Sequence, residues 1–104
     1  MQQIEFSVPA RCDLKKADAL IERVCAAHGL EAAMKGTLAT HPGSIHWHWK
    51  MPKQKGTLEL TLSRVDRRIW AAIHTNRQAP WIEQVLNRVR ADIERALQGT
   101  ADRS

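Results

Sequence analysis

The chain has 104 residues, of which 43% are hydrophobic and 26% are charged, and its formal net charge is +5. This length suits one domain with a single core, and the composition is that of a globular protein, which excludes fibrous and disordered classes. No apolar stretch approaches the roughly 18 residues of a membrane span. The first residues lack a basic region followed by an apolar run, so we expect no signal peptide and a cytoplasmic protein. Neither cysteine, Cys12 nor Cys25, is expected in a disulfide.

The amino-terminal part of the chain predicts a strand followed by a helix. Residues 2–8 alternate apolar and polar side chains, which is typical of a half-buried strand. Residues 13–28 carry apolar side chains at helical spacing, with Asp13 as the expected N-cap and Gly29 just past the end. We therefore expect a helix over 13–28.

The remainder of the chain predicts four strands and a second helix. A proline-containing turn at 41–44 separates the first two of these strands, and a tight turn at 65–68 separates the last two. Pro80 suits the first turn of the helix, and Gly99 is expected to close it. The predicted strands are residues 31–40, 45–51, 57–64 and 69–73, and the helix follows from residue 80.

The element order β-α-β-β-β-β-α predicts an α+β fold. Four consecutive strands share one apolar face, and two amphipathic helices are available to cover it. We expect a curved, five-stranded, mostly antiparallel sheet with both helices packed on one face, as one domain over residues 1–98 with a frayed tail at 99–104. This order resembles one half of the TATA-binding protein fold. The resemblance concerns topology alone and implies no function, because unrelated functions share folds.

The segment His46-Trp47-His48-Trp49 alternates two residue types with the period of a β-strand. The histidines therefore face one side of the sheet and the tryptophans the other. Because the neighbouring strands place leucine and isoleucine on the tryptophan side, we interpret both tryptophans as core anchors and not as a platform for stacking nucleic-acid bases. The predicted core face holds Ile4, Phe6, Val8, Ile45, Trp47, Trp49, Leu58, Leu60, Leu62, Ile69, Ala71 and Ile73.

The opposite side of the sheet, which we call the polar face, carries the candidate functional residues. A loop centred between Lys53 and Gln54 pairs His48 with Glu59, and a tight turn centred on Asp66-Arg67 pairs Glu59 with His74. The polar face consists of His46, His48, Glu59, Thr61, Ser63, Trp70 and His74.

The row His48–Glu59–His74 allows three interpretations. The favoured one is a carboxylate between two solvated histidines, with no metal or cofactor. Two histidines and one carboxylate could instead share a metal ion. The carboxylate could also raise the pKa of a neighbouring histidine for acid/base catalysis.

Trp70 is the unusual member of the polar face, because this register sets it beside Ser63 and away from the helices. An exposed tryptophan on an open sheet indicates contact with a partner, a ligand or a second copy of the chain. The alternative is that the curled sheet or a terminus covers it.

The excess positive charge lies within residues 32–80, which hold eight basic and two acidic residues. Lys50, Lys53 and Lys55 are expected near Arg77 and the start of the second helix, where they could bind an anion. Three arginines, Arg64, Arg67 and Arg68, mark the opposite end of the sheet. Charge at both ends argues against one focused groove, so solvated loops are the favoured interpretation.

No catalytic motif of high specificity occurs in the chain: it contains no HExxH, paired CxxC or glycine-rich phosphate loop. We hypothesise a small binding module, not an enzyme, whose polar face meets a protein partner or a second copy. One alternative is nucleic-acid binding by the basic 32–80 segment. Another is a metal- or ligand-dependent enzyme that uses His46, His48, Glu59 and His74. The sequence identifies no substrate. We expect no membrane partner.

Overall fold

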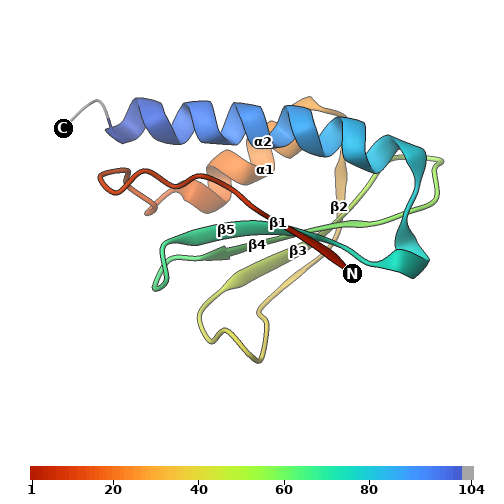
Figure 1. Cartoon of the computed structure of the whole chain (residues 1–104), viewed down its shortest axis with the longest axis horizontal. Helices are drawn as coiled ribbons and strands as arrows, with labels where there is room; N and C mark the ends of the chain where they lie inside the picture. Colours follow the sequence, from red (N-terminus) through yellow and green to blue (C-terminus); the bar gives the residue numbers. More distant parts are fainter. Residues whose placement is uncertain (102–104) are drawn as a thin grey trace.

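The computed structural model describes residues 1–101, and it confirms the predicted α+β fold with a five-stranded antiparallel sheet and two helices. The strands lie in the order β1-β5-β4-β3-β2, and each neighbouring pair is antiparallel. Both helices lie on one side of the sheet (Figure 1). The elements are β1 (Gln2–Glu5), α1 (Ala17–Ala27), β2 (Glu31–Gly36), β3 (Ile45–Lys50), β4 (Leu58–Ser63), β5 (Arg68–Ile73), a 3₁₀ turn (Thr75–Arg77) and α2 (Pro80–Ala101).

The predicted sidedness of the sheet is confirmed. Trp47 and Leu60 are fully buried between the sheet and the helices, and the other predicted core residues lie in or against the same cluster. The Nε1 of Trp47 donates a hydrogen bond of 3.0 Å to Glu22 of α1, which fixes the indole against that helix. Among residues 1–101, the buried Nε1 of Trp49 has no hydrogen-bond partner.

Helix α1 begins four residues later than predicted. Asp13 does not cap it: the Asp13 carboxylate accepts a 2.8 Å hydrogen bond from the backbone N–H of Lys15, in a local turn that precedes the helix. The guanidinium of Arg64 donates to the carbonyls of Leu14 and Lys15, so the turn is tied to the end of β4. These contacts satisfy the backbone of the turn without a helix.

The carboxyl end of α1 follows the prediction. Gly29 has a φ of +83°, and the N–H of Leu30 donates to the carbonyl of Cys25 at 3.0 Å, which is a Schellman arrangement. The imidazole of His28 lies 2.7 Å from the carboxylate of Asp92 and so joins α1 to α2. Both cysteines are free, as predicted.

Helix α2 begins at Pro80 as predicted and continues through Gly99 to Ala101. The glycine therefore does not close the helix. The last part of the predicted frayed tail, residues 102–104, lies outside the described residues. Among residues 1–101, no helix is both long and apolar enough to span a bilayer.

Of the two predicted hairpin registers, one is confirmed and the other is wrong. The β3–β4 register is confirmed, with His48 opposite Glu59. The β4–β5 register is wrong by two residues, since Glu59 lies opposite Ala72 and not His74. The connection is a four-residue loop in which Arg67 adopts a φ of +53°, and the pair that closes it is Ser63 with Arg68. A shift of two residues preserves the face of every side chain, because side chains alternate with period two.

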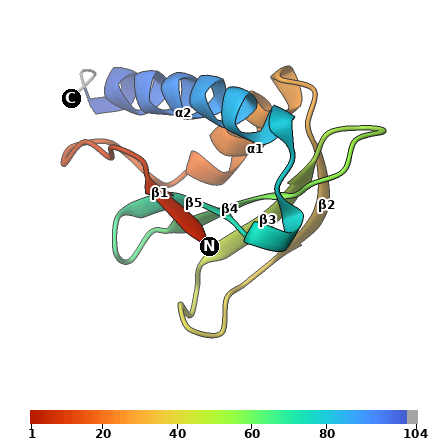
Figure 2. The same ribbon diagram turned by 45° about the vertical axis from the view of Figure 1, so that its right-hand side comes forward.

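The segment between β2 and β3, residues 37–44, projects on the side of the sheet away from the helices (Figures 1 and 2). The predicted turn at 41–44 is present: the N–H of Ser44 donates to the carbonyl of His41 at 3.0 Å, and Gly43 has a φ of +82°. The polar face is therefore flanked by a loop, and it is not a bare sheet surface.

Candidate functional site

Glu59 is the centre of the polar face. Its carboxylate belongs to a residue that is only 7% exposed, and it lies in the middle of β4. The Nε2 of His46 lies 3.1 Å and the Nε2 of His48 3.6 Å from Oε1 of Glu59. The Nε2 of His74 lies 3.0 Å and a guanidinium nitrogen of Arg77 3.5 Å from Oε2. We call these five residues the Glu59 cluster.

The two histidines of β3 reach the same carboxylate oxygen because they lie two residues apart on one face of the strand. His48 is directly opposite Glu59, and His46 is opposite Thr61, which lies two residues after Glu59 on the same face of β4. The two imidazole rings meet edge to face with centroids 5.1 Å apart. Their Nε2 atoms thus converge on Oε1 from neighbouring positions of one strand.

His46 is held on its other side by Thr61, whose hydroxyl lies 2.7 Å from Nδ1 of the imidazole. This contact fixes the ring with Nε2 toward Glu59. Burial lowers the pKa of His46, and this effect outweighs the opposing attraction of Glu59. The neutral imidazole is therefore favoured at this buried position.

His74 and Arg77 arrive from the segment that follows β5. The 3₁₀ turn Thr75–Arg77 is closed by a 2.9 Å hydrogen bond from the N–H of Arg77 to the carbonyl of His74. This turn folds both side chains back toward Oε2, so that one oxygen of Glu59 faces two histidines and the other faces His74 and Arg77. The carboxylate is therefore held on both sides.

The structure brings together three of the residues predicted as a row, but not in the predicted way. His48 lies beside Glu59 as predicted, whereas His74 reaches Glu59 from beyond the strand and not from the opposite position. Sequence reasoning placed His46 on the correct face but left it out of the row. Its spacing of two residues from His48 was the signal that could have included it.

Trp70 and Ser63 lie on the polar face but not in the Glu59 cluster. Trp70 is only 6% exposed, since the ring of His41 lies 5.0 Å from it and the guanidinium of Arg68 lies 4.5 Å from its centroid. Trp70 is therefore covered, but by His41 of the 37–44 segment and by Arg68, and neither was the cover expected from the sequence. Ser63 is also buried, and its hydroxyl donates to Asp66 in the β4–β5 loop.

The three arginines predicted to mark one end of the sheet serve the fold. Arg64 pairs with Asp18, and Arg67 donates to the carbonyls of Pro9 and Cys12. Arg68 pairs with Glu5. The arginines at this end of the sheet therefore hold the β1–α1 connection in place.

The elements expected around the candidate anion site do lie together, since the N–H of Thr57 donates to the carbonyl of Arg77 at 3.0 Å. The 51–57 loop does lie against the start of α2, because the Nε1 of Trp81 donates to the carbonyl of Lys55 at 2.7 Å. Lys50 and Lys53 belong to the same hairpin end. Arg77, however, contacts Glu59, so its charge belongs to the Glu59 cluster.

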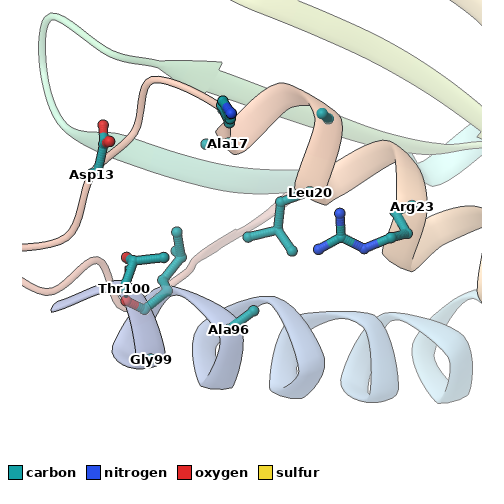
Figure 3. Close-up of a pocket in the computed structure, with 10 residues that line it drawn as sticks. Asp13, Ala17, Leu20, Arg23, Ala96, Gly99 and Thr100 are labelled. Carbon is teal, nitrogen blue, oxygen red and sulfur yellow. Dashed lines mark hydrogen bonds between the residues drawn. The ribbon is translucent and has the colours of Figure 1, made fainter. Parts of the chain in front are cut away.

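The cavities of the structure differ in what they offer a ligand. One, of about 260 Å³, adjoins the Glu59 cluster on the polar face and is lined in part by His46, Glu59 and His74. A larger cavity of about 420 Å³ lies between α1 and α2, where Leu20 and Arg23 face Ala96 and Thr100 (Figure 3). Neither this cavity nor another of about 490 Å³, which lies beside Gln2, Ile73 and Pro80, brings together a group of histidines and carboxylates, so we place the candidate site at the smallest of the three.

The donor atoms of the Glu59 cluster fit a small cation. His46, His48 and Glu59 offer one ligand atom each, and these atoms lie within 4.8 Å of one another. Zinc–nitrogen bonds of 2.0–2.1 Å place tetrahedral ligands about 3.3 to 3.4 Å apart. The Nε2–Oε1 distances of 3.1 and 3.6 Å lie on either side of that edge length.

No protein-family model matches this chain, and no curated protein or solved structure matches it. The resemblance of its topology to half of the TATA-binding protein fold therefore stays a prediction.

Proposed function

We propose that this protein binds one divalent transition-metal ion of the zinc class on the polar face of its sheet. The ligands are Nε2 of His46, Nε2 of His48 and Oε1 of Glu59. The observation that carries the proposal is the convergence of both Nε2 atoms on one buried carboxylate oxygen, at 3.1 and 3.6 Å. Two imidazoles with one carboxylate form a set that binds zinc, iron(II) and related ions.

The groups behind the three ligands support the same proposal. Metal-binding histidines usually bond through their second nitrogen to a fixed acceptor, and metal-binding carboxylates are themselves hydrogen-bonded. Thr61 supplies this contact to His46, and His74 supplies it to the second oxygen of Glu59. In this arrangement His74 orients the carboxylate and is not a ligand.

Within residues 1–101, Arg77 is the one lysine or arginine whose side chain pairs with Glu59. Its guanidinium lies 3.5 Å from Oε2 of Glu59, on the oxygen that the ion does not use, and its side chain is 46% exposed. Solvent therefore screens its repulsion of the ion. The alternative to the proposal is that Arg77 and the histidines alone neutralise the charge of Glu59, with no metal ion bound.

The test uses untagged protein from which a chelator has removed any metal. Zinc binding is titrated by calorimetry, and the bound zinc is then measured by elemental analysis. We expect one equivalent of zinc for the wild type. His48→Ala should weaken binding by at least about 100-fold, because a ligand contributes more than the 10- to 100-fold typical of an outer contact. His48 is partly exposed, so this substitution spares the core.

The matched control is His28→Ala, which removes a histidine that pairs with Asp92 between the helices. It should leave zinc affinity unchanged. Zinc binding that is absent in the wild type, or that falls equally in both variants, would contradict the proposal.

A further inference from the structure

The cavity beside the Glu59 cluster has walls of two kinds. Its lining includes the imidazole of His46 and the carboxylate of Glu59. The lining also includes the apolar side chains of Leu38, Trp70 and Ala72, of which Ala72 lies directly opposite Glu59. An ion held by His46, His48 and Glu59 would border this cavity through His46 and Glu59, which line it together with the apolar side chains; His48 is not among the lining residues.

The shape of this cavity follows from the observed register of β4 and β5. Ala72 lies opposite Glu59, so the position beside the carboxylate carries only a methyl group. Trp70, two residues before Ala72 on the same strand, is held in place by His41 and Arg68. The cavity is thus bounded by a small side chain beside Glu59 and by a fixed aromatic ring.

The size and charge of the cavity restrict its ligand. Its volume of about 260 Å³ lies below the roughly 300–1,000 Å³ of pockets for drug-sized molecules. The two positive charges of a divalent ion exceed the single negative charge of Glu59, and Arg77 adds a further positive charge nearby. Arg68 lines the cavity but is paired with Glu5, so it adds little. A small ligand with one negative charge therefore fits best.

We infer that the cavity binds a small carboxylic acid with a compact apolar body, whose carboxylate coordinates the metal ion. This inference rests on the proposed metal site. Three protein ligands leave coordination positions for an exogenous donor, as in catalytic zinc sites. The apolar body would lie against Trp70, Leu38 and Ala72.

The test uses two probes, benzoate and acetate, with zinc-loaded and chelator-stripped protein in calorimetry. Benzoate should bind the zinc-loaded protein at least about tenfold more tightly than acetate, because its ring is buried against the apolar wall. Neither probe should bind the stripped protein measurably. Equal affinity for the two probes, or equal benzoate binding with and without zinc, would overturn the inference.

Two variants separate the cavity from the metal. Ala72→Leu fills the space beside Glu59, so it should abolish benzoate binding while one equivalent of zinc is still bound. Ala32→Leu, on the exposed strand β2, is the matched control and should change neither.

If Ala72→Leu fails to fold, Leu38→Ala in the 37–44 segment removes part of the apolar wall. It should weaken benzoate binding several-fold and leave the affinities for acetate and zinc unchanged. Zinc binding without benzoate binding would refute this inference alone, whereas absence of zinc binding would refute the proposed function itself.

Discussion

Trp47 and Trp49 form a matched pair in which one hydrogen bond differs. Both are buried, with exposures of 0% and 3%, and their rings stack with centroids 6.3 Å apart. The Nε1 of Trp47 donates to Glu22, whereas that of Trp49 has no partner within residues 1–101. Replacing each with phenylalanine removes a similar volume, so the difference between the two variants isolates the two N–H groups.

The magnitude follows from these contacts. A hydrogen bond to a charged group contributes about 1.5–3 kcal/mol, and the 39% exposure of the Glu22 side chain reduces this to about 1 kcal/mol. A buried N–H without a partner costs about 1–3 kcal/mol, which Trp49→Phe relieves. We therefore expect Trp47→Phe to be less stable than Trp49→Phe by about 2 to 4 kcal/mol.

Urea unfolding followed by far-ultraviolet circular dichroism measures this difference. With a slope of about 1–3 kcal/mol per molar urea, the two midpoints should be separated by roughly 0.7 M or more. A double-mutant cycle adds Glu22→Gln to each variant and should show coupling with Trp47 but none with Trp49. Equal midpoints, or a lower midpoint for Trp49→Phe, would refute the reasoning.

Two further predictions concern charge and backbone. The hydrogen bonds from Lys35 and Trp47 lower the pKa of Glu22 in the folded state, so this group stabilises the fold above its unfolded pKa of roughly 4.3. That stability is lost as the pH falls through the folded pKa, so a Glu22→Gln variant should lose up to about 1 kcal/mol at pH 7 and approach the wild type in acid unfolding. An equal difference in the free energy of unfolding between the wild type and Glu22→Gln at pH 7 and at pH 2 would contradict this. Gly56→Ala should destabilise by more than about 2 kcal/mol, because the residue has a φ of +102° and the added Cβ would lie 2.7 Å from Cβ of Ala79. The control, Gly99→Ala in α2, meets nothing within 4 Å and should raise the melting temperature; a fall in both variants would refute the comparison.

The sequence was informative where side-chain periodicity decides the outcome. Alternation in the His46–Trp49 segment correctly sorted core from polar face, and the β3–β4 register followed from placing each large aliphatic residue on one side. Both are consequences of burying apolar area, which periodicity reports directly.

The β4–β5 register could not be predicted from periodicity. It depends on the conformation of the loop between the two strands, which the alternation of side chains does not specify. Arg67 adopts a left-handed φ of +53° without being glycine or asparagine, and its guanidinium donates to the carbonyls of Pro9 and Cys12. Such long-range contacts offset the local strain. The resulting shift moved Ala72, not His74, opposite Glu59, and this opened the cavity.

The site itself was only half predictable for a similar reason. The polar face and the His48–Glu59 pair follow from strand geometry, whereas the role of His46 depends on how side chains lean along the strand. Its contact with Thr61 sets that direction. The cover over Trp70 depends on the path of the 37–44 segment, which alternation does not specify.

Anomalous diffraction at the zinc edge, from crystals grown with one equivalent of zinc, tests the central proposal most directly. We expect one peak about 2.0–2.2 Å from Nε2 of His46, Nε2 of His48 and Oε1 of Glu59. His74 should remain on the other oxygen of the carboxylate. A peak at His28 and Asp92 between the helices, or none at Glu59, would contradict the proposal.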